Sequence, residues 1–197
     1  MAEVKRFLAT LRHISPVDLE YYLEEEHSSG HVLKPLGQES LLFLSFTEEK
    51  PEKCAYVVDV SALPKAMYVP TLVKKGWEPM GQAMNCYIWR QYYKDDKRPE
   101  NFADRLCLRM HCIRLGIVML IVALLFLGLS ATYFYLLWKE KQQGIPDHFW
   151  KYLILGIVHL PFFGYAAWAA RKLFREAAAL MERLKAGKII SKKQQDI

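Results

Sequence analysis

Residues 115–138 read LGIVMLIVALLFLGLSATYFYLLW, an apolar run whose only ionisable side chains are tyrosine phenols. As an α-helix this run is about 36 Å long, which exceeds the roughly 30 Å thickness of a bilayer's hydrocarbon core. Aromatic rings gather at its far end, where amphipathic side chains favour the level of the lipid headgroups. The run therefore predicts a first transmembrane helix over 115–138.

A second apolar run, residues 149–170, contains Lys151, His159 and Pro161. Lys151 lies near its start, where a lysine can extend its ammonium group towards water. The stretch 139–148 joins the two runs and carries good turn chemistry, so the two helices must be antiparallel. The sequence predicts a two-helix hairpin with a second span over 149–170 and an extracytoplasmic loop over 139–148.

The net charge of +6 is concentrated after the second run. Residues 1–114 hold 16 basic and 16 acidic side chains, whereas residues 171–197 hold eight basic and three acidic ones. Basic residues at the outer ends of the two spans favour the cytoplasmic side of a membrane. The expected location is the cell (inner or plasma) membrane, crossed twice, with both termini cytoplasmic. The folded part has no basic excess, which argues against a nucleic-acid partner and leaves the lipid bilayer as the first partner.

Residues 1–97 predict a cytoplasmic α+β domain. A serine cap followed by Pro16 starts one helix, which Gly30 ends, and a second helix over 65–75 is closed by Gly76. Pro70 fits poorly inside that second helix and favours a start near Val69. Strand-like runs lie at 5–10, 32–36, 41–46, 55–60, 77–80 and 87–91. We expect two β-α-β-β repeats that form a sheet with both helices on one face. The acidic run Glu24-Glu25-Glu26 is interpreted as a solvated face.

The flanks of the hairpin carry further predictions. Residues 98–114 are expected to form a basic juxtamembrane helix. Residues 171–197 are expected to form a basic amphipathic cytoplasmic tail, because apolar side chains recur there every three to four residues as far as Gly187. Three interpretations of the tail stay open: it lies on the anionic inner leaflet, it packs on the domain or a second subunit, or it continues the second span.

Four stretches of the domain stand out together: Glu20 to Glu25 before Gly30, Tyr56 to Asp59, Lys75-Gly76-Trp77-Glu78, and Tyr87-Ile88-Trp89. On these residues the domain resembles a bacterial family known as domain of unknown function 2812. The resemblance covers roughly residues 4–95. It implies a membrane-associated protein of Gram-positive bacteria, and the family has no activity to carry over. The first repeat departs from the family pattern, with Ser29-Gly30-His31 where Lys-Gly-Trp is usual.

The sequence favours a protein that is not an enzyme. It holds none of the phosphate-loop, nucleophile-elbow, dinucleotide or HExxH motifs, so we expect no catalytic residue and no cofactor. Four cysteines include Cys107 and Cys112, which flank His111 on the predicted helix before the first span. No CxxC pair accompanies them, so we expect no metal site and interpret them as reduced thiols.

Two groups of residues are candidate sites. Trp77, Tyr87 and Trp89 could form a ligand or partner surface, although a tryptophan after a helix-ending glycine is more simply explained by packing. His159 is a possible intramembrane polar site, because an ionisable group within a span is costly. It could instead form a structural hydrogen bond, for example with Ser130 or Thr132.

The function predicted from these features is a membrane-tethered interaction or sensory and regulatory module without catalytic activity. One alternative is an accessory subunit of a membrane transporter or envelope-stress system, which would dock through the helical hairpin. Another is a small-ligand-binding domain. A protein partner or a second copy of the chain is expected in the first two cases.

Overall fold

The computed structural model describes residues 3–36, 43–60, 65–83, 86–94, 97–144 and 148–195. The chain divides into two compact units. The first comprises Met1–His111 together with Ala179–Ile197 and is called the domain here. The second comprises Cys112–Ala178 and is called the hairpin.

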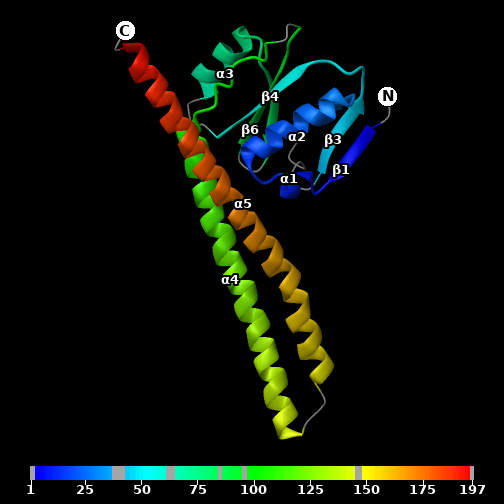
Figure 1. Cartoon of the computed structure of the whole chain (residues 1–197). Coiled ribbons are helices and arrows are strands. Elements are labelled where there is room, and N and C mark those ends of the chain that lie inside the picture. The colour runs from blue at the N-terminus through cyan, green and yellow to red at the C-terminus, as the bar shows by residue number, and fades with distance from the viewer. Residues whose placement is uncertain are drawn as a thin grey trace. The chain divides into compact units, whose positions relative to one another are not determined.

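The domain combines strands and helices in the order expected for an α+β protein (Figure 1). Its strands are β1 (Glu3–Phe7), β2 (His31–Leu33), β3 (Phe43–Glu48), β4 (Cys54–Asp59), β5 (Glu78–Ala83) and β6 (Cys86–Tyr92). Its helices are α1 (Ala9–Arg12), α2 (Pro16–Ser28) and α3 (Lys65–Lys74). The part of the predicted strand 41–46 that precedes Phe43 lies outside the described residues.

The ends of α2 and α3 follow local sequence signals. Helix α2 starts at Pro16, and Gly30 after it has the positive φ of +88° that glycine adopts without a steric penalty. Gly76 after α3 has a φ of +87° for the same reason. Helix α3 begins at Lys65, so the expected start near Val69 is wrong. Pro70 lies inside the helix, where it removes one backbone N–H donor and leaves the remaining turns in place.

The strands form two three-stranded antiparallel sheets, with strand orders β1-β3-β2 and β4-β6-β5, where a single sheet was expected. The chain that follows β2 passes from one sheet to the other. Lys34 donates its backbone N–H to the carbonyl oxygen of Ser45 at 2.9 Å, and Leu36 donates to that of Met80 at 2.6 Å. The second of these bonds joins the sheets at the edge of β5. Gly81, with a φ of +107°, allows this approach, because a Cβ there would lie 2.7 Å from the carbonyl oxygen of Leu36.

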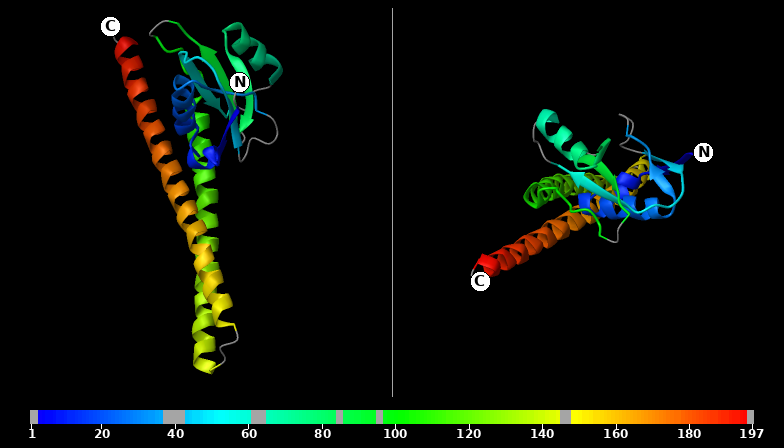
Figure 2. Two further views of the ribbon diagram at one scale, coloured as in Figure 1. Left: turned by 90° about the vertical axis from the view of Figure 1, so that its right-hand side faces the viewer. Right: turned by 90° about the horizontal axis from the view of Figure 1, so that it is seen from above.

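One hydrophobic core joins α2 to both sheets. It includes Leu19 and Leu23 of α2, Phe46 of β3, Tyr56 of β4 and Ile88 of β6, each at most 2% exposed. Every residue of β4 is buried, so both faces of this strand need a covering layer. Helices α2 and α3 accordingly lie on opposite sides of the strands (Figure 2). The expectation that both helices share one face is wrong.

Helices α4 (Arg105–Gln143) and α5 (Phe149–Gln195) supply the hairpin, and the first turns of α4 and the last turns of α5 belong to the domain. Both helices are long and apolar enough to cross a membrane, over Arg105–Gln142 and Phe149–Lys185. Only 17% and 22% of the residues in their most apolar stretches are buried within the chain. The hairpin agrees with the one predicted.

Small residues mediate the contact between the two helices of the hairpin. Ser130 of α4 donates its hydroxyl to the carbonyl oxygen of Gly156 of α5 at 2.8 Å. The ring of Phe134 covers Gly156, where an added Cβ would lie 3.2 Å from the ring. Ala123 and Ala166, one from each helix, are also almost fully buried. Close approach through small residues is typical of paired helices in membranes.

The flanking segments differ from prediction in two respects. Helix α4 starts at Arg105, so residues 98–104 of the predicted juxtamembrane helix are not helical. Helix α5 continues without interruption from the second predicted span past Gly187 to Gln195, which corresponds to the third interpretation of the tail. In the predicted loop 139–148, α4 runs on to Gln143, and residues 145–147 lie outside the described part of the chain.

Candidate functional site

Helix α2 directs three polar side chains towards strand β4, those of Glu20, Glu24 and His27. The spacings of four and three residues put them on one side of the helix. Leu19 and Leu23 lie on the neighbouring strip and are buried in the core. Burial of these leucines therefore holds the polar row against the sheet.

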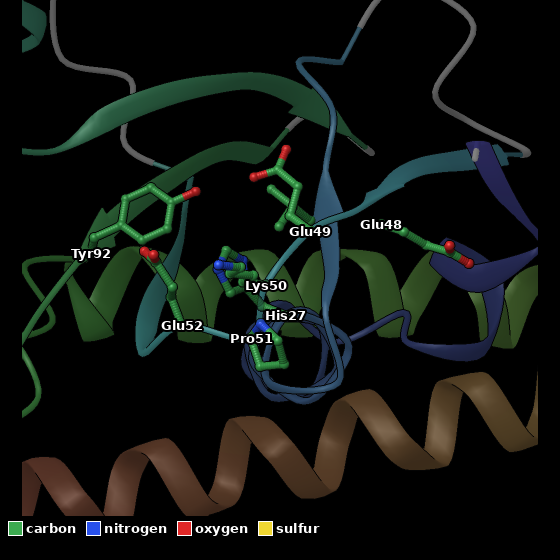
Figure 3. A pocket seen from close by; sticks show the side chains of 8 residues that line it. His27, Glu48, Glu49, Lys50, Pro51, Glu52 and Tyr92 are labelled. Carbon is green, nitrogen blue, oxygen red and sulfur yellow. The ribbon is translucent and has the colours of Figure 1, made fainter. Parts of the chain in front are cut away.

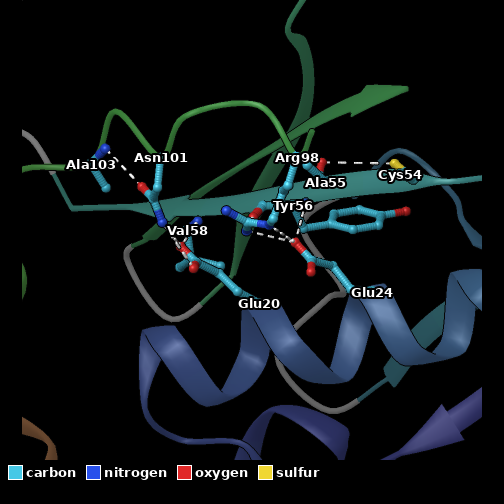
Figure 4. A network of polar contacts seen from close by, with 9 residues as sticks. All are labelled: Glu20, Glu24, Cys54, Ala55, Tyr56, Val58, Arg98, Asn101 and Ala103. Carbon is cyan, nitrogen blue, oxygen red and sulfur yellow. Dashed lines mark hydrogen bonds and ion pairs between the residues drawn. The ribbon is translucent and has the colours of Figure 1, made fainter. Parts of the chain in front are cut away.

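Strand β4 is the outer strand of its sheet, so the N–H groups on its free edge need partners from elsewhere. Glu20 accepts a hydrogen bond from the backbone N–H of Val58 at 2.8 Å, and Glu24 accepts one from that of Tyr56 at 3.0 Å (Figure 4). The two carboxylates occupy the place of a neighbouring strand. These two hydrogen bonds fix α2 on the free edge of β4.

The segment 97–104, which leads into α4, is bonded to the same two carboxylates. Arg98 donates to Glu24 with an N···O distance of 2.7 Å, and Asn101 donates its side-chain amide to Glu20 at 3.1 Å (Figure 4). We call Glu20, Glu24, Arg98 and Asn101 the edge latch. The edge latch joins three parts of the domain: helix α2, the free edge of β4, and the segment that precedes α4.

Two further hydrogen bonds support the edge latch. Arg98 donates to the carbonyl oxygen of Tyr56 at 3.2 Å, so it meets both a side chain and the strand edge. The side-chain oxygen of Asn101 accepts from the backbone N–H of Ala103 at 2.9 Å, which fixes the orientation of the amide. Both polar ends of Asn101 therefore have partners.

Glu20 is the titratable centre of the edge latch, because its side chain is only 5% exposed. Burial raises the pKa of Glu20 to about 7, and the nearby Glu24 adds to the rise. The hydrogen bonds from Val58 and Asn101 and the charge of Arg98 act in the opposite direction. A carboxyl group with this pKa changes its charge near neutral pH, whereas an ordinary glutamate is fully ionised there.

A pocket of about 760 Å³ lies at the carboxyl end of the same helix (Figure 3). It is lined by His27, by Tyr92 at the end of β6, by Glu48 at the end of β3, and by the loop from Glu49 to Glu52 that follows. His27 is 1% exposed, and its Nδ1 lies 3.0 Å from the phenol oxygen of Tyr56. Burial, assisted by the charge of Arg90, lowers the pKa of His27, so the imidazole is neutral at physiological pH.

The aromatic residues predicted as a surface belong to the face of the sheet β4-β6-β5 that is turned away from α2. The rings of Trp77 and Trp89 meet Phe102 edge-on, with centroid distances of 5.0 and 6.1 Å, and both tryptophans are at most 4% exposed. Tyr87 shares a face of β6 with Trp89 and is half-buried. The structure brings Trp77 and Trp89 together around Phe102, a residue of the segment 97–104, which favours the packing explanation. A ligand surface at Trp77, Tyr87 and Trp89 stays a prediction.

His159 forms a hydrogen bond within its own helix. Its Nδ1 lies 2.5 Å from the carbonyl oxygen of Leu155, and because a carbonyl oxygen only accepts, Nδ1 carries the proton. Ser130 donates instead to Gly156, and Thr132 donates to a carbonyl of its own helix. The expected pairing of His159 with Ser130 or Thr132 is absent among these bonds. Its role as an intramembrane polar site stays a prediction.

The cysteines are free thiols, and Cys86 rather than Cys107 lies near His111. The distance between the sulfur of Cys86 and Nε2 of His111 is 3.7 Å, whereas Cys107 donates to Asp104 at 3.2 Å. Within the described ranges, no group of three or more histidine, cysteine or acidic side chains has a geometry that could hold a metal ion.

Sequence reasoning missed the edge latch. Glu24-Glu25-Glu26 was interpreted as a solvated face, but only Glu25 of the three is exposed. Glu24 is part of the edge latch, and Glu26 forms an ion pair with Arg6 at 3.1 Å. Neighbours on a helix point about 100° apart, so three consecutive glutamates cannot share one face. The usable signal was the position of Glu20 and Glu24, each directly after a leucine of the apolar stripe.

Comparisons with models of protein families, with curated proteins and with solved structures find no match for this chain. The arrangement of α2, β4 and the segment 97–104 is therefore interpreted from its own geometry.

Proposed function

We propose that the chain is a two-span protein of the cell membrane whose cytoplasmic domain has a sensory and regulatory role without catalysis. Two apolar helices of membrane-spanning length support this assignment. The basic residues at the outer ends of both spans favour cytoplasmic termini. The proposed partners are the lipid bilayer and either another protein or a second copy of this chain.

The edge latch is the observation that carries the proposal. A regulatory domain needs a contact that can change its state and that involves the segment it controls. The segment 97–104 connects the sheets to α4 along the chain, and Arg98 and Asn101 bind it to α2. Because Glu20 gains and loses a proton near pH 7, the strength of this contact depends on the local environment of one buried carboxyl group.

Membership of the family known as domain of unknown function 2812 is part of the proposal, and so is an origin from two β-α-β-β repeats. The strand orders β1-β3-β2 and β4-β6-β5 support the repeat, because each sheet places its third strand between the first two. The two helices end at equivalent glycines, Gly30 and Gly76, with almost equal φ angles of +88° and +87°.

The membrane topology is tested with single cysteine substitutions at two exposed lysines. Lys97 precedes α4 in the proposed cytoplasmic part, and Lys141 lies at the far end of α4. A membrane-impermeant maleimide added to intact cells is expected to label Lys141→Cys and to leave Lys97→Cys and the unaltered chain unlabelled. Labelling of the Lys97→Cys and unaltered chains without labelling at position 141 would reverse the orientation, and labelling of neither introduced cysteine in intact cells but of both after lysis would remove the membrane spans.

The regulatory role is tested by crosslinking in native membranes followed by mass spectrometry. The double variant Arg98→Gln, Asn101→Leu removes the charged guanidinium and the asparagine amide from the edge latch, and Lys97→Gln removes a neighbouring charge that is outside it. We expect the double variant to change the set or yield of crosslinked partners and Lys97→Gln to leave it unaltered. Identical crosslinks from all three chains would contradict control through the edge latch.

A small-ligand-binding domain is the second candidate function, and the pocket beside His27 favours it. An accessory subunit that docks through its spans makes a different prediction. Replacement of 115–138 and 149–170 by unrelated spans would then abolish its crosslinks, whereas a domain that acts by itself would keep them.

A further inference from the structure

The Nε2 atom of His27 is a buried nitrogen with no hydrogen-bond partner among the described residues. The proton arrangement follows from its neighbours. Tyr56 is fully buried, and among the described residues Nδ1 of His27 is the hydrogen-bond partner of its phenol oxygen, so the phenol proton has an acceptor only if it is donated there. The phenol proton is therefore directed to Nδ1 of His27, 3.0 Å away. In a neutral imidazole the ring proton then resides on Nε2, which is a donor without an acceptor.

The two nitrogens of an imidazole ring point in different directions, so Nε2 points away from Tyr56, which bonds Nδ1. His27 is also one of the residues that line the pocket. Figure 3 shows the side chains that line the pocket, with Tyr92 beside Glu52. A buried donor without an acceptor is destabilising, so its retention points to a group that binds there.

The rim of the pocket is acidic. Glu48, Glu49 and Glu52 contribute three carboxylates and Lys50 one ammonium group. Both Glu49 and Glu52 line the same pocket as His27 and act electrostatically on its imidazole. The loop is attached to the end of α2, because Glu49 donates its backbone N–H to the carbonyl oxygen of Gly30 at 2.9 Å. A Cβ on Gly30 would lie 2.9 Å from the carbonyl oxygen of Glu49, which indicates how close the approach is.

We propose that this pocket binds a small organic cation in which a protonated amine stands next to an oxygen acceptor, as in an amino alcohol. The oxygen accepts the proton of Nε2 of His27, and the ammonium group contacts Glu49 and Glu52. This inference rests on the proposed sensory function and names the chemical class of its ligand.

Other ligand classes fit the pocket less well. An anion would face three carboxylates, and a purely apolar molecule would leave the donor of His27 unsatisfied. A metal ion would need the lone pair of a ring nitrogen, but Nδ1 accepts from Tyr56 and Nε2 carries the proton. A simple amine would satisfy Glu49 and Glu52 and still leave Nε2 without an acceptor.

The pocket and the edge latch share helix α2. His27 follows Glu24 by three residues and Glu20 by seven, so these side chains lie on consecutive turns. A ligand that holds His27 against Glu49, Glu52 and Tyr92 stabilises the position of α2 that also forms the edge latch. Such a ligand binds this state better than a state with α2 displaced, which is the condition for a regulatory effect.

The full chain, purified in detergent, is titrated with ethanolamine, ethylamine and ethylene glycol by isothermal titration calorimetry and ligand-observed NMR. Ethanolamine carries both required groups, ethylamine lacks the oxygen, and ethylene glycol lacks the charge. We expect ethanolamine to bind in the millimolar range or better and each of the other two probes to bind at least about fivefold more weakly. Equal binding of ethanolamine and ethylamine, or no binding of ethanolamine, would overturn the proposal.

Three variants locate the binding. Glu52→Gln removes an exposed pocket carboxylate, and we expect it to weaken ethanolamine binding about tenfold, as the loss of a charge-assisted contact does. His27→Phe keeps a ring but removes the donor and is expected to abolish the preference for ethanolamine over ethylamine. Glu25→Gln removes an exposed charge from the same helix outside the pocket and is expected to change nothing. If Glu52→Gln and Glu25→Gln weaken binding equally, the ligand is not in this pocket.

These results separate the ligand class from the regulatory role. If ethanolamine fails to bind while Arg98→Gln, Asn101→Leu still changes the crosslinked partners, the ligand class is wrong and the regulatory function stands. If ethanolamine binds as expected while the crosslinks never change, the pocket is a binding site and the edge latch does not regulate.

Discussion

The domain and the hairpin treat buried polar groups in opposite ways. Five of the buried polar side chains belong to the domain, namely Thr10, Ser15, Glu20, His27 and Asp59. In the described part of the hairpin, Ser130 is the buried polar side chain. Three of the five in the domain can ionise, whereas a serine hydroxyl does not change its charge in the physiological pH range.

The partners of these groups differ as well. In the domain, Glu20 bonds Val58, which is 38 positions away, and Asn101, which is 81 positions away. In the hairpin, His159 bonds a carbonyl four residues earlier, and so does Thr132. A change of charge at Glu20 therefore acts between distant segments, whereas the polar groups of the hairpin mostly satisfy their own helix. We infer from this difference that the domain responds to changes in charge, whereas the hairpin is a fixed framework.

The largest effect that we expect is the pH dependence of the domain's free energy of unfolding, and it would sharpen this comparison. The pKa of Glu20 rises from 4.5 to about 7 on folding, so the folded state binds more protons than the unfolded state between these values. The free energy of unfolding therefore falls as the pH rises through this window, by up to about 3 kcal/mol, and levels off above it. Hydrogen exchange at the amides of Tyr56 and Val58, corrected for intrinsic rates between pH 5 and 8, measures this change.

Glu20→Gln is the variant for this measurement, and Glu25→Gln is its control. Glutamine keeps an acceptor for Val58 but has no charge to titrate, so its exchange profile is expected to be flat across the window. Glu25→Gln is expected to follow the unaltered chain. A wild-type profile as flat as that of Glu20→Gln would contradict a titrating carboxyl group in the edge latch.

Backbone geometry gives the next largest difference between the two units. In the domain, Gly81→Ala forces a Cβ to within 2.7 Å of the carbonyl oxygen of Leu36 at a φ of +107°. We expect a loss of about 2 kcal/mol in the free energy of unfolding, measured by hydrogen exchange across β5 and β6. Gly128→Ala in the hairpin meets nothing within 4 Å and is expected to cost nothing measurable. Equal costs at both sites would show that the two units tolerate change alike.

Local features of the fold were predictable from the sequence, and long-range ones were not. The run 115–138 gave the first helix of the hairpin, because span length depends only on rise per residue and the absence of charge. Gly30 and Gly76 gave the helix ends, because positive φ is a property of one residue. The division into two sheets depends on pairings between distant strands, such as β1 with β3 and β4 with β6, which no periodicity reveals.

The candidate site was the least predictable part. Arg98 and Asn101 were assigned to a helix before the first span, because their neighbours are basic and the chain soon becomes apolar. Their partners on α2 lie 74 and 81 positions earlier. A pattern of local spacing carries no information on such a pairing. The local hint was that Glu20 and Glu24 each directly follow a leucine of the core.

The contribution of Arg98 is the next prediction. Its ion pair with Glu24 is partly exposed, at 37% and 22% of the two side chains, so solvent weakens it. We expect Arg98→Gln to lower the free energy of opening of the segment 97–104 by about 1 kcal/mol, because the bond to the carbonyl oxygen of Tyr56 is lost too. Hydrogen exchange over this segment measures it, with Lys97→Gln as the control. Equal exchange in both variants would make Arg98 dispensable to the edge latch.

A smaller effect is expected at the contact between the helices of the hairpin. Ser130→Ala removes the hydrogen bond to Gly156, which is worth about 0.6 kcal/mol on average for such bonds in membranes. Thr132→Ala is the matched control, since its hydroxyl bonds a carbonyl of its own helix. Unfolding of the full chain in mixed detergent micelles compares the two. If Thr132→Ala lowers the free energy of unfolding as much as Ser130→Ala does, the hydrogen bond between the helices has no special contribution.

The smallest effect is expected at His159, although an ionisable residue in a span is the feature that sequence alone marks most strongly. Its ring lies 5.4 Å from that of Tyr133 and 5.8 Å from that of Phe126, and its hydrogen bond stays within its own helix. His159→Phe keeps the aromatic contacts and removes a bond that spans one turn, so we expect stability to change by less than about 0.5 kcal/mol. If this variant inserts and unfolds normally but alters the crosslinked partners, the hairpin also responds to its surroundings. The contrast between a responsive domain and a fixed hairpin would then fail at His159, the residue for which it predicts the smallest effect.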